Sequence, residues 1–210
     1  MKTKSGISRV SNTYTDMKRI ITISFTLILA TLSAFAKSPG AQPVTAVPKV
    51  DLNKYAGEWY EIAKYPNKFQ DKCVGNTSAI YTLKTDGKIE VLNRCLEKDG
   101  TVNDAKGEAK VVDKKTNAKL EVRFAPKHLS LIPSVWGDYW VIELPEDYSY
   151  SVVGTPDRKY FWILSRKAQM TDATYQEILR RAEQQGFEPA KVVKTPHGVA
   201  AGNGAALTKN

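Results

Sequence analysis

Charged and apolar residues alternate along two segments near the middle of the chain. Between residues 119 and 124 every second residue is charged, and the residues between them are Leu120, Val122 and Phe124. Residues 88–91 repeat the pattern with Ile89 and Val91. A period of two is typical of β-strands with one buried face and one wet face. These five apolar side chains are therefore predicted to point into the interior of a sheet protein.

Turn signals divide the surrounding sequence into further strands. Asp86-Gly87 lies between two apolar runs and is a strong hairpin signal, because tight hairpin turns need residues that adopt a positive φ. Strands are predicted at residues 57–64, 75–84, 88–96, 106–113, 118–124, 137–144, 148–154 and 159–166. Consecutive strands with hairpin-length links predict an all-β fold, an eight-stranded up-and-down antiparallel β-barrel, because closure removes the exposed sheet edges.

The last three strands break the alternation. Residues 139–142 and 160–164 are apolar on both faces, so another element must cover the outside of this sector. A C-terminal α-helix that begins at Thr171 or Asp172 and stops near Gly186 is predicted to pack there, outside the barrel, with a short strand at 188–193 after it. Its apolar stripe consists of Tyr175, Ile178, Leu179 and Ala182. Because alternation does not decide which face of the late strands is inward, the weaker candidates for the interior are Tyr139, Val141, Tyr148 and Tyr150.

The two ends of the chain lack the strand pattern. Residues 20–36 are apolar, follow Met17-Lys18-Arg19, and end in Ala34-Phe35-Ala36, the small-x-small pattern of a signal-peptidase site. We interpret residues 1–36 as a secretory signal peptide, with Met1 or Met17 as the start, rather than as a retained membrane anchor. Residues 37–50 are predicted to be a spacer, residues 51–195 the barrel domain, and residues 196–210 a disordered tail.

The charge of the chain changes when the signal is removed. Residues 1–36 carry a net charge of +4, so their removal leaves +5 of the chain's +9. Basic and acidic side chains are interleaved along the predicted strands, which is typical of a solvated sheet face rather than of a nucleic-acid site. We therefore expect no nucleic-acid partner. Transient contact with an anionic membrane surface is compatible with this moderate positive charge and with export.

Cys73 and Cys95 are the only cysteines of the chain. They flank the hairpin that turns at Asp86-Gly87, and export places them in an oxidising compartment, so we predict a disulfide between them. Two buried thiols are the alternative. A metal site is disfavoured, because two sulfurs need two further ligands and the chain has only His128 and His197 as histidines.

Three short motifs stand out: Gly57-Glu58-Trp59 at the start of the first strand, the turn from Pro156-Asp157 to Tyr160 before a late strand, and Arg166 at the end of that strand. They resemble motifs of the lipocalin family, and the run from Gly154 to Arg166 resembles its bacterial members in particular. The resemblance extends over residues 51–194 and implies that Trp59 plugs the closed end of the barrel while Arg166 lies across it. A guanidinium over an indole face contributes about 0.5–2 kcal/mol, so these motif residues are expected to be structural.

The resemblance also bears on localisation and on the mouth of the barrel. Bacterial lipocalins are often lipoproteins, but Lys37 rather than a cysteine follows Ala36, so a soluble periplasmic protein is expected, with outer-membrane association as the alternative. The apolar segment 125–137 is placed by the resemblance at the open mouth. Its side chains, Trp136 among them, line the entrance, touch a membrane, or fold back over the core.

The predicted lining suits an elongated apolar ligand. The candidate ligand-binding residues are Ile89, Val91, Leu120, Val122, Phe124, Trp136, Tyr139, Val141 and Tyr150. The resemblance implies a fatty acid or a lysophospholipid as the ligand, which we expect to be held for transport or storage. Because the chain has few histidines, we expect no catalytic residue, and we expect no cofactor. The alternatives are a haem or pigment binder that uses His128, and an enzyme on a lipocalin scaffold. The oligomeric state is not predicted.

Overall fold

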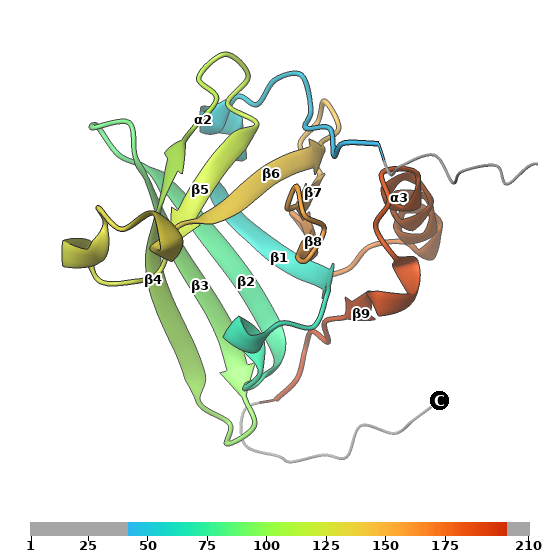
Figure 1. Cartoon of the computed structure of the whole chain (residues 1–210). Helices are drawn as coiled ribbons and strands as arrows, with labels where there is room; N and C mark the ends of the chain where they lie inside the picture. The colour runs from blue at the N-terminus through green and yellow to red at the C-terminus, as the bar shows by residue number, and fades with distance from the viewer. Residues whose placement is uncertain (1–41, 201–210) are drawn as a thin grey trace, which may run out of the picture. The chain divides into compact units, whose positions relative to one another are not determined.

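The computed structural model describes residues 42–200, and in them the strands form a closed antiparallel barrel. Each strand pairs with the next along the chain, β8 pairs with β1, and β1 pairs with β2, so the barrel closes on itself (Figure 1). The strands are β1 (Gly57–Lys64), β2 (Cys73–Leu83), β3 (Ile89–Glu97), β4 (Val102–Val111), β5 (Lys119–Arg123), β6 (Gly137–Glu143), β7 (Tyr150–Gly154) and β8 (Phe161–Ser165). The predicted eight-stranded up-and-down barrel is confirmed.

A ninth short strand, β9 (Val193–Lys194), pairs with the second half of β1. The first half of β1 pairs with β2 instead, from Gly57 to Tyr60. β9 therefore covers the part of the β1 edge from which β2 has diverged towards the mouth. The strand predicted for this region was placed at 188–193, where a 3-10 helix η4 (Pro189–Lys191) is found instead.

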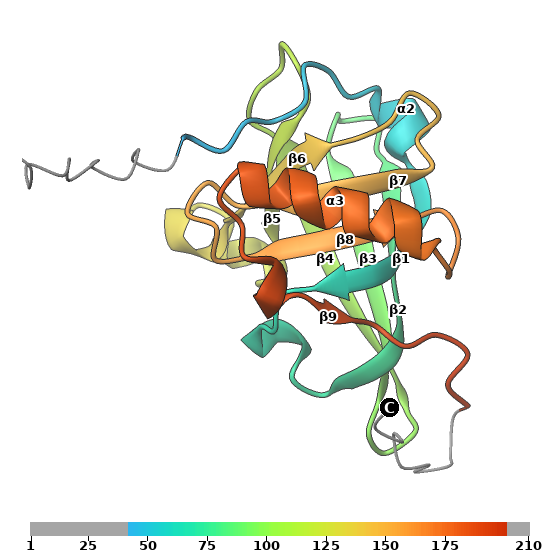
Figure 2. The same cartoon turned by 90° about the vertical axis from the view of Figure 1, so that its right-hand side faces the viewer.

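The predicted C-terminal helix is α3 (Asp172–Gln184), and it packs outside the barrel across β7 and β8 (Figure 2). Thr171 caps it, since its side chain accepts a hydrogen bond from the N–H of Thr174 at 3.2 Å. Tyr175, Ile178 and Ala182 are buried, as the apolar stripe predicts. The helix shares one core cluster with the outward residues of the late strands, which are Ile142, Val152, Phe161 and Ile163. These strands are apolar on both faces because each face is covered.

The two ends of the barrel are built from different elements. Helix α2 (Leu52–Tyr55) lies at the closed end, at the top of Figure 1, with the turns β2–β3 and β4–β5. The opposite end carries three 3-10 helices, η1 (Lys68–Gln70), η2 (Lys127–Leu129) and η3 (Pro133–Val135). They belong to the β1–β2 and β5–β6 connections, which form the mouth.

Several predicted boundaries differ from the structure. β2 begins at Cys73 rather than at residue 75, because bulges near Gly75 extend its pairing with β3. β4 begins at Val102 rather than at residue 106, because Val102 still pairs with Leu96 across the hairpin. β8 begins at Phe161, because the preceding turn holds residues 155–160.

The described part of the predicted spacer is packed against the barrel. Val44 and Val50 are buried, and the N–H groups of Val47 and Val50 donate to the carbonyls of Val141 and Thr116. The beginning of the predicted disordered tail is also held, because the N–H of Asn76 donates to the Pro196 carbonyl at 2.8 Å. The predicted signal peptide lies outside the described residues. Within residues 42–200, no helix has the length and apolar character needed to span a membrane.

Candidate ligand-binding cavity

Trp59 fills the closed end of the barrel beneath the guanidinium of Arg166. Trp59 has no exposed surface, and its Nε1–H donates to the carbonyl of Tyr55 at 2.8 Å. The guanidinium carbon of Arg166 lies 3.7 Å from the centre of the indole ring. The same guanidinium donates to the carbonyls of Lys54, Tyr55, Ala56 and Glu58 at 2.6–3.2 Å. Arg166 therefore joins α2 to β1 and β8 at the end that excludes ligand.

Gly57 allows this approach. Its φ is +96°, a conformation that side chains with a Cβ rarely adopt, and a Cβ there would lie 3.4 Å from Nη1 of Arg166. The second motif is a turn at the opposite end. The Thr155 hydroxyl donates to Asp157 at 2.7 Å and accepts from the N–H of Tyr160, which fixes the chain before β8. The Tyr160 ring then stacks on Trp162, with centroids 5.8 Å apart.

The barrel contains a cavity of about 830 Å³, a size typical of small-molecule sites. Seven of the candidate residues line it. The alternation predicts this for Ile89, Val91, Leu120, Val122 and Phe124, and the mouth position predicts it for Trp136. Tyr139, a weaker candidate that alternation did not decide, lines the cavity as well. Their charged neighbours along β3 and β5, such as Glu90 and Glu121, form ion pairs with lysines on neighbouring elements instead. The cavity wall is therefore mainly apolar.

Three of the four weaker candidates do not line the cavity, and they are Val141, Tyr148 and Tyr150. Val141 points inward, but it is completely buried in the cluster around Trp59, below the cavity. Tyr150 points outward, where its hydroxyl donates to Glu143 and accepts from Arg181 of α3. Assigning Tyr150 to the lining was wrong. Because α3 covers the outer face of β7, both faces of this strand are buried. The sequence therefore lacks the contrast between apolar and polar positions from which the orientation of Tyr150 could be predicted.

Part of the lining was not predicted from the sequence. Tyr55 of α2 and Tyr81 of β2 line the cavity beside Tyr139. Tyr55 precedes the first strand, where no strand period applies, whereas Tyr81 could have been found by extending the alternation of β2. The three phenol hydroxyls are linked by hydrogen bonds, because the hydroxyl oxygen of Tyr139 lies 2.8 Å from that of Tyr55 and 3.0 Å from that of Tyr81. Burial raises the pKa of Tyr55 to about 12 and also raises the pKa values of Tyr81 and Tyr139.

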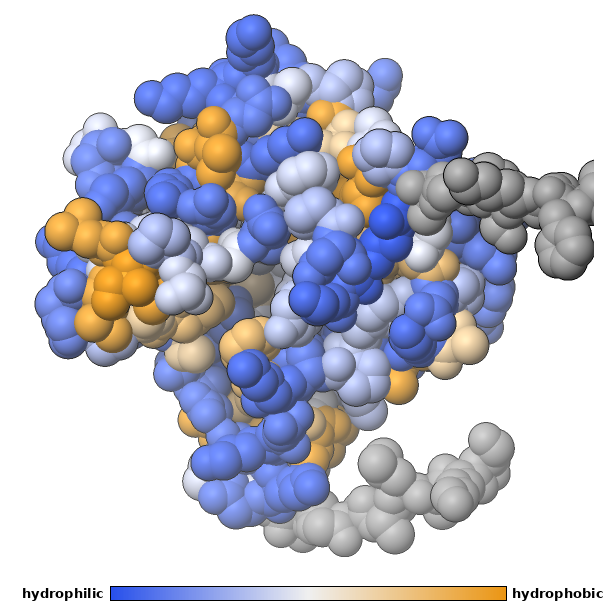
Figure 3. Space-filling view, viewed as in Figure 1, coloured by the Kyte–Doolittle hydropathy of each residue, from blue (hydrophilic) through white to orange (hydrophobic). Residues whose placement is uncertain are grey.

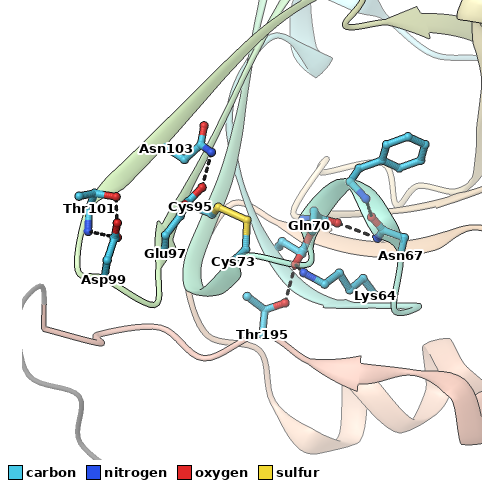
Figure 4. Close-up of a disulfide and its surroundings, with 12 residues drawn as sticks. Lys64, Asn67, Gln70, Cys73, Cys95, Glu97, Asp99, Thr101, Asn103 and Thr195 are labelled. Carbon is cyan, nitrogen blue, oxygen red and sulfur yellow. Dashed lines mark hydrogen bonds and ion pairs between the residues drawn. A yellow bond between two sulfur atoms is a disulfide. The ribbon is translucent and has the colours of Figure 1, made fainter.

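A polar network occupies one side of the cavity near the mouth. The Glu61 carboxylate, only 3% exposed, accepts hydrogen bonds from Gln70 at 2.7 Å and from Thr195 at 2.6 Å. The Lys64 ammonium lies 3.1 Å from the same carboxylate, and the indole N–H of Trp162 donates to Gln70. The partners of Glu61 come from η1 and the segment after β9, so this network fixes the mouth loop (Figure 4). The alternation of apolar and charged residues does not predict a carboxylate that points into the barrel, such as that of Glu61.

The disulfide between Cys73 and Cys95 is confirmed and lies at the same end of the barrel (Figure 4). Its Cα atoms are 5.6 Å apart. Cys73 pairs with Glu97 at the start of β2, and the bulges that follow bring Ser78 opposite Arg94. These register shifts explain how two cysteines that are not direct partners in the ladder meet. Both cysteines line the cavity, so the disulfide ties the two strands of its wall together.

The β5–β6 connection presents apolar side chains in two directions. Val135 and Trp136 line the cavity, and the Trp136 indole N–H donates to the Ser130 carbonyl at 2.9 Å. Leu131 and Ile132 point outward and are 93% and 44% exposed. They contribute to the apolar patch on the left of Figure 3, the side on which Figure 1 shows η2 and η3. His128 is exposed on η2 and does not line the cavity.

Comparisons with known proteins agree with this arrangement. Residues 50–197 match the family model described as a lipocalin-like domain. Temperature-induced lipocalin-1 of Arabidopsis thaliana is 43% identical over 152 residues, covering 71% of this chain and 81% of that protein. Outer membrane lipoprotein Blc of Escherichia coli K12 is 33% identical over 173 residues, covering 80% of this chain and 93% of that protein.

Solved structures show the same fold. Insecticyanin from Manduca sexta matches with a TM-score of 0.59 at 22% identity, over 75% of this chain and 86% of that one. The family model covers more than half of the chain, and both curated relatives exceed 30% identity. The chain therefore belongs to the lipocalin family and is similar to its bacterial member Blc.

Proposed function

We propose that this lipocalin is an exported carrier that holds a fatty acid or a lysophospholipid in the barrel cavity for transport or storage. The observation that carries the proposal is the cavity of about 830 Å³, closed at one end by Trp59 and lined mainly by apolar side chains. Such a cavity binds an elongated apolar molecule with one end near the mouth. Lipocalin relatives support binding of small hydrophobic ligands, and the acyl ligand is the proposal.

The acyl chain would lie against the apolar wall formed by β3, β4 and β5. Ile89, Val91, Ala109 and Leu120 form one buried cluster on this wall, and Val122 packs against it. Each methylene removed from water here contributes up to about 0.8 kcal/mol, less the cost of ordering the chain. The affinity should therefore rise with chain length until the cavity is full.

The polar head would lie at the mouth. Lys68 of η1 is exposed there and lines the cavity, and the Thr155–Tyr160 turn faces the same opening. An ammonium group at the rim can pair with a carboxylate or a phosphate that stays in contact with water. This arrangement requires no full charge to enter the apolar part of the cavity.

Transient contact with a membrane surface is the second part of the proposal. Leu131 and Ile132 are exposed on the mouth loop, and Lys127 lies on the same loop. Exposed apolar side chains with a flanking cation suit insertion into the interface of an anionic membrane. Insertion at the mouth would place the cavity opening next to the lipid from which a ligand is taken.

Export is the third part, and it rests on the sequence and on the disulfide. The apolar segment 20–36 has the features of a signal peptide, and Cys73 and Cys95 are paired, as in proteins of oxidising compartments. We expect the exported protein to begin at or near Lys37 and to be unacylated. N-terminal sequencing and intact mass of the exported protein test this; an uncleaved signal or an added acyl mass would contradict it.

We propose binding rather than catalysis as the activity. The haem alternative relied on His128, which does not line the cavity. The Nε2 atom of the other histidine, His197, lies 2.8 Å from the Glu61 carbonyl oxygen, so this nitrogen already has a hydrogen-bond partner. Within residues 42–200, no group of three or more His, Cys, Asp or Glu side chains could hold a metal ion. The geometry therefore favours a ligand that is held by shape and apolar contact.

A chain-length titration tests the carrier function. Protein stripped of bound lipid would be titrated with saturated fatty acids of increasing length and with matching lysophospholipids, by calorimetry. We expect severalfold tighter binding for several added carbons, followed by a plateau. Absence of binding for every acyl ligand would overturn the proposal.

A further inference from the structure

Four hydroxyl groups meet at the floor of the cavity, and they have one more proton to donate than they have hydrogen bonds with one another. Tyr55 contacts both Ser151 at 2.9 Å and Tyr139 at 2.8 Å, and Tyr139 contacts Tyr81 at 3.0 Å. Each hydroxyl carries one proton to donate, so the group offers four donors for three hydrogen bonds. Among residues 42–200 these hydroxyls make no other hydrogen bond. One proton is therefore left without an acceptor, whatever the direction of the chain.

Burial decides where this spare proton lies. Ser151 has no exposed surface and does not line the cavity, so an unused donor on Ser151 would be buried without any partner. Donation from Ser151 to Tyr55 avoids that cost. The spare proton then belongs to one of the three tyrosines, and all three line the cavity.

The charge around the floor decides which acceptor fits. Phenols are protonated at neutral pH, and burial raises the pKa of all three further above their ordinary value. The cations of the cavity lining, Lys68 and Arg94, belong to η1 and to the mouth half of β3. Arg166 lies beyond Trp59, where its N–H groups donate to backbone carbonyls, and its charge opposes the effect of burial on the pKa of Tyr55 only in part. A carboxylate at the floor would therefore be desolvated with no cation in contact with it, whereas a neutral oxygen costs much less to desolvate.

We propose that the hydroxyl cluster of Tyr55, Tyr81, Tyr139 and Ser151 is a subsite for a neutral hydrogen-bond acceptor at the deep end of the ligand. The inference rests on the proposed carrier function and narrows its ligand class. The preferred ligand is an elongated lipid whose inner end carries a ketone, ester or ether oxygen, while its charged head stays at the mouth. An unmodified acyl chain would bind but would leave the spare proton unused.

Matched ligand pairs test this subsite. Stripped protein would be titrated with hexadecanoic acid and 15-oxohexadecanoic acid, and with the equivalent pairs that are two carbons shorter and longer. In the wild-type protein the oxo acid should bind at least as tightly as its parent at the length that reaches the floor. Replacement of the four hydroxyls in Tyr55→Phe/Tyr81→Phe/Tyr139→Phe/Ser151→Ala should reduce the affinity ratio of oxo acid to parent by about tenfold.

Two controls keep the test decisive. Tyr60→Phe removes a phenol hydroxyl that donates to Glu58, outside the cavity lining, and should leave the ratio unchanged. If the fourfold variant does not fold, the infrared carbonyl band of the bound, isotope-labelled oxo acid in the wild-type protein gives the answer. A band at the lower frequency of a hydrogen-bonded ketone supports the subsite, and a band at the frequency found in hexane overturns it.

The outcomes separate this inference from the carrier function. If the parent acid binds and the oxo acid is weaker by the same factor in the wild-type protein and the fourfold variant, the subsite is wrong and the carrier function stands. If neither acid binds the wild-type protein, the carrier function fails and the subsite with it.

Discussion

The guanidinium of Arg166 lies over the indole ring of Trp59, with 3.7 Å between the guanidinium carbon and the ring centre. The two residues are distant in sequence: Trp59 belongs to β1, and Arg166 directly follows β8, which pairs with β1 in the barrel. Arg166 also donates to four carbonyls between Lys54 and Glu58. Burial lowers its pKa, but the group is held by these acceptors and by the π face. The pair closes the barrel and shields the floor of the cavity from water.

Truncation of this pair should destabilise the barrel. Trp59→Ala is expected to lower the free energy of unfolding by about 3–5 kcal/mol, because Trp59 is fully buried. Arg166→Ala should cost less. Arg166→Lys is the control, because the lysine ammonium keeps the positive charge but does not form the same hydrogen bonds to the four carbonyls. Urea unfolding followed by circular dichroism measures all three, and unchanged stability of both alanine variants would show that neither residue closes the barrel.

Loss of the disulfide should lower stability without removing the cavity. Cys73 and Cys95 are 22 residues apart, and a loop of this size contributes on the order of 3 kcal/mol by constraining the unfolded chain. Cys73→Ala/Cys95→Ala, or reduction of the wild-type protein, should therefore lower the Tm by several degrees. Calorimetric melting with and without reductant checks this. The same Tm in both conditions would contradict a stabilising role.

Alkaline pH should unfold the protein through its buried tyrosines. Burial raises the pKa of Tyr55 to about 12 and also raises those of Tyr81 and Tyr139 above the ordinary value, whereas unfolded tyrosines ionise near pH 10. Above about pH 10 the unfolded chain therefore loses protons that the folded chain keeps. The free energy of unfolding should then fall with rising pH, by up to about 1.4 kcal/mol per pH unit for each tyrosine.

Denaturant unfolding between pH 8 and pH 11 measures this dependence. Below about pH 9 the three tyrosines are protonated in both the folded and the unfolded state, so they add nothing to the pH dependence of the free energy of unfolding. Tyr81→Phe/Tyr139→Phe should be less sensitive than the wild-type protein above pH 10, since two of the three groups are gone. Equal slopes for the two proteins would show that these phenols are not held in their protonated form.

The mouth loop should carry the contact with membranes. Leu131→Asp/Ile132→Asp is expected to reduce partitioning onto phosphatidylglycerol vesicles by roughly tenfold, because two exposed apolar side chains lose their favourable transfer. Val112→Asp is the matched control, since Val112 is 58% exposed but follows β4 at the closed end. Vesicle sedimentation at fixed salt measures partitioning. Equal binding of both variants would mean that the mouth does not face the membrane.

The sequence predicted the barrel and most of its lining wherever one strand face is wet. At the start of β3 and along β5 a charged residue precedes each inward apolar one, so Val91 and Leu120 were placed correctly. In β7 this contrast is missing, because α3 covers the outer face, and Tyr150 was assigned to the wrong side. Glu61 was missed for a different reason. Its partners Gln70 and Thr195 approach it only once the barrel has closed. No local sequence pattern predicts a carboxylate that points into the barrel.

Binding of an acyl ligand inside the barrel is tested most directly by one matched pair of variants, Val91→Trp and Glu90→Trp. Val91 is 2% exposed on the cavity wall, whereas its neighbour Glu90 points outward and pairs with Lys84 at 2.9 Å. Titration of both stripped variants with hexadecanoic acid should show binding weakened severalfold or more in Val91→Trp and unchanged in Glu90→Trp. Equal affinity of the two variants would contradict a ligand site inside the barrel.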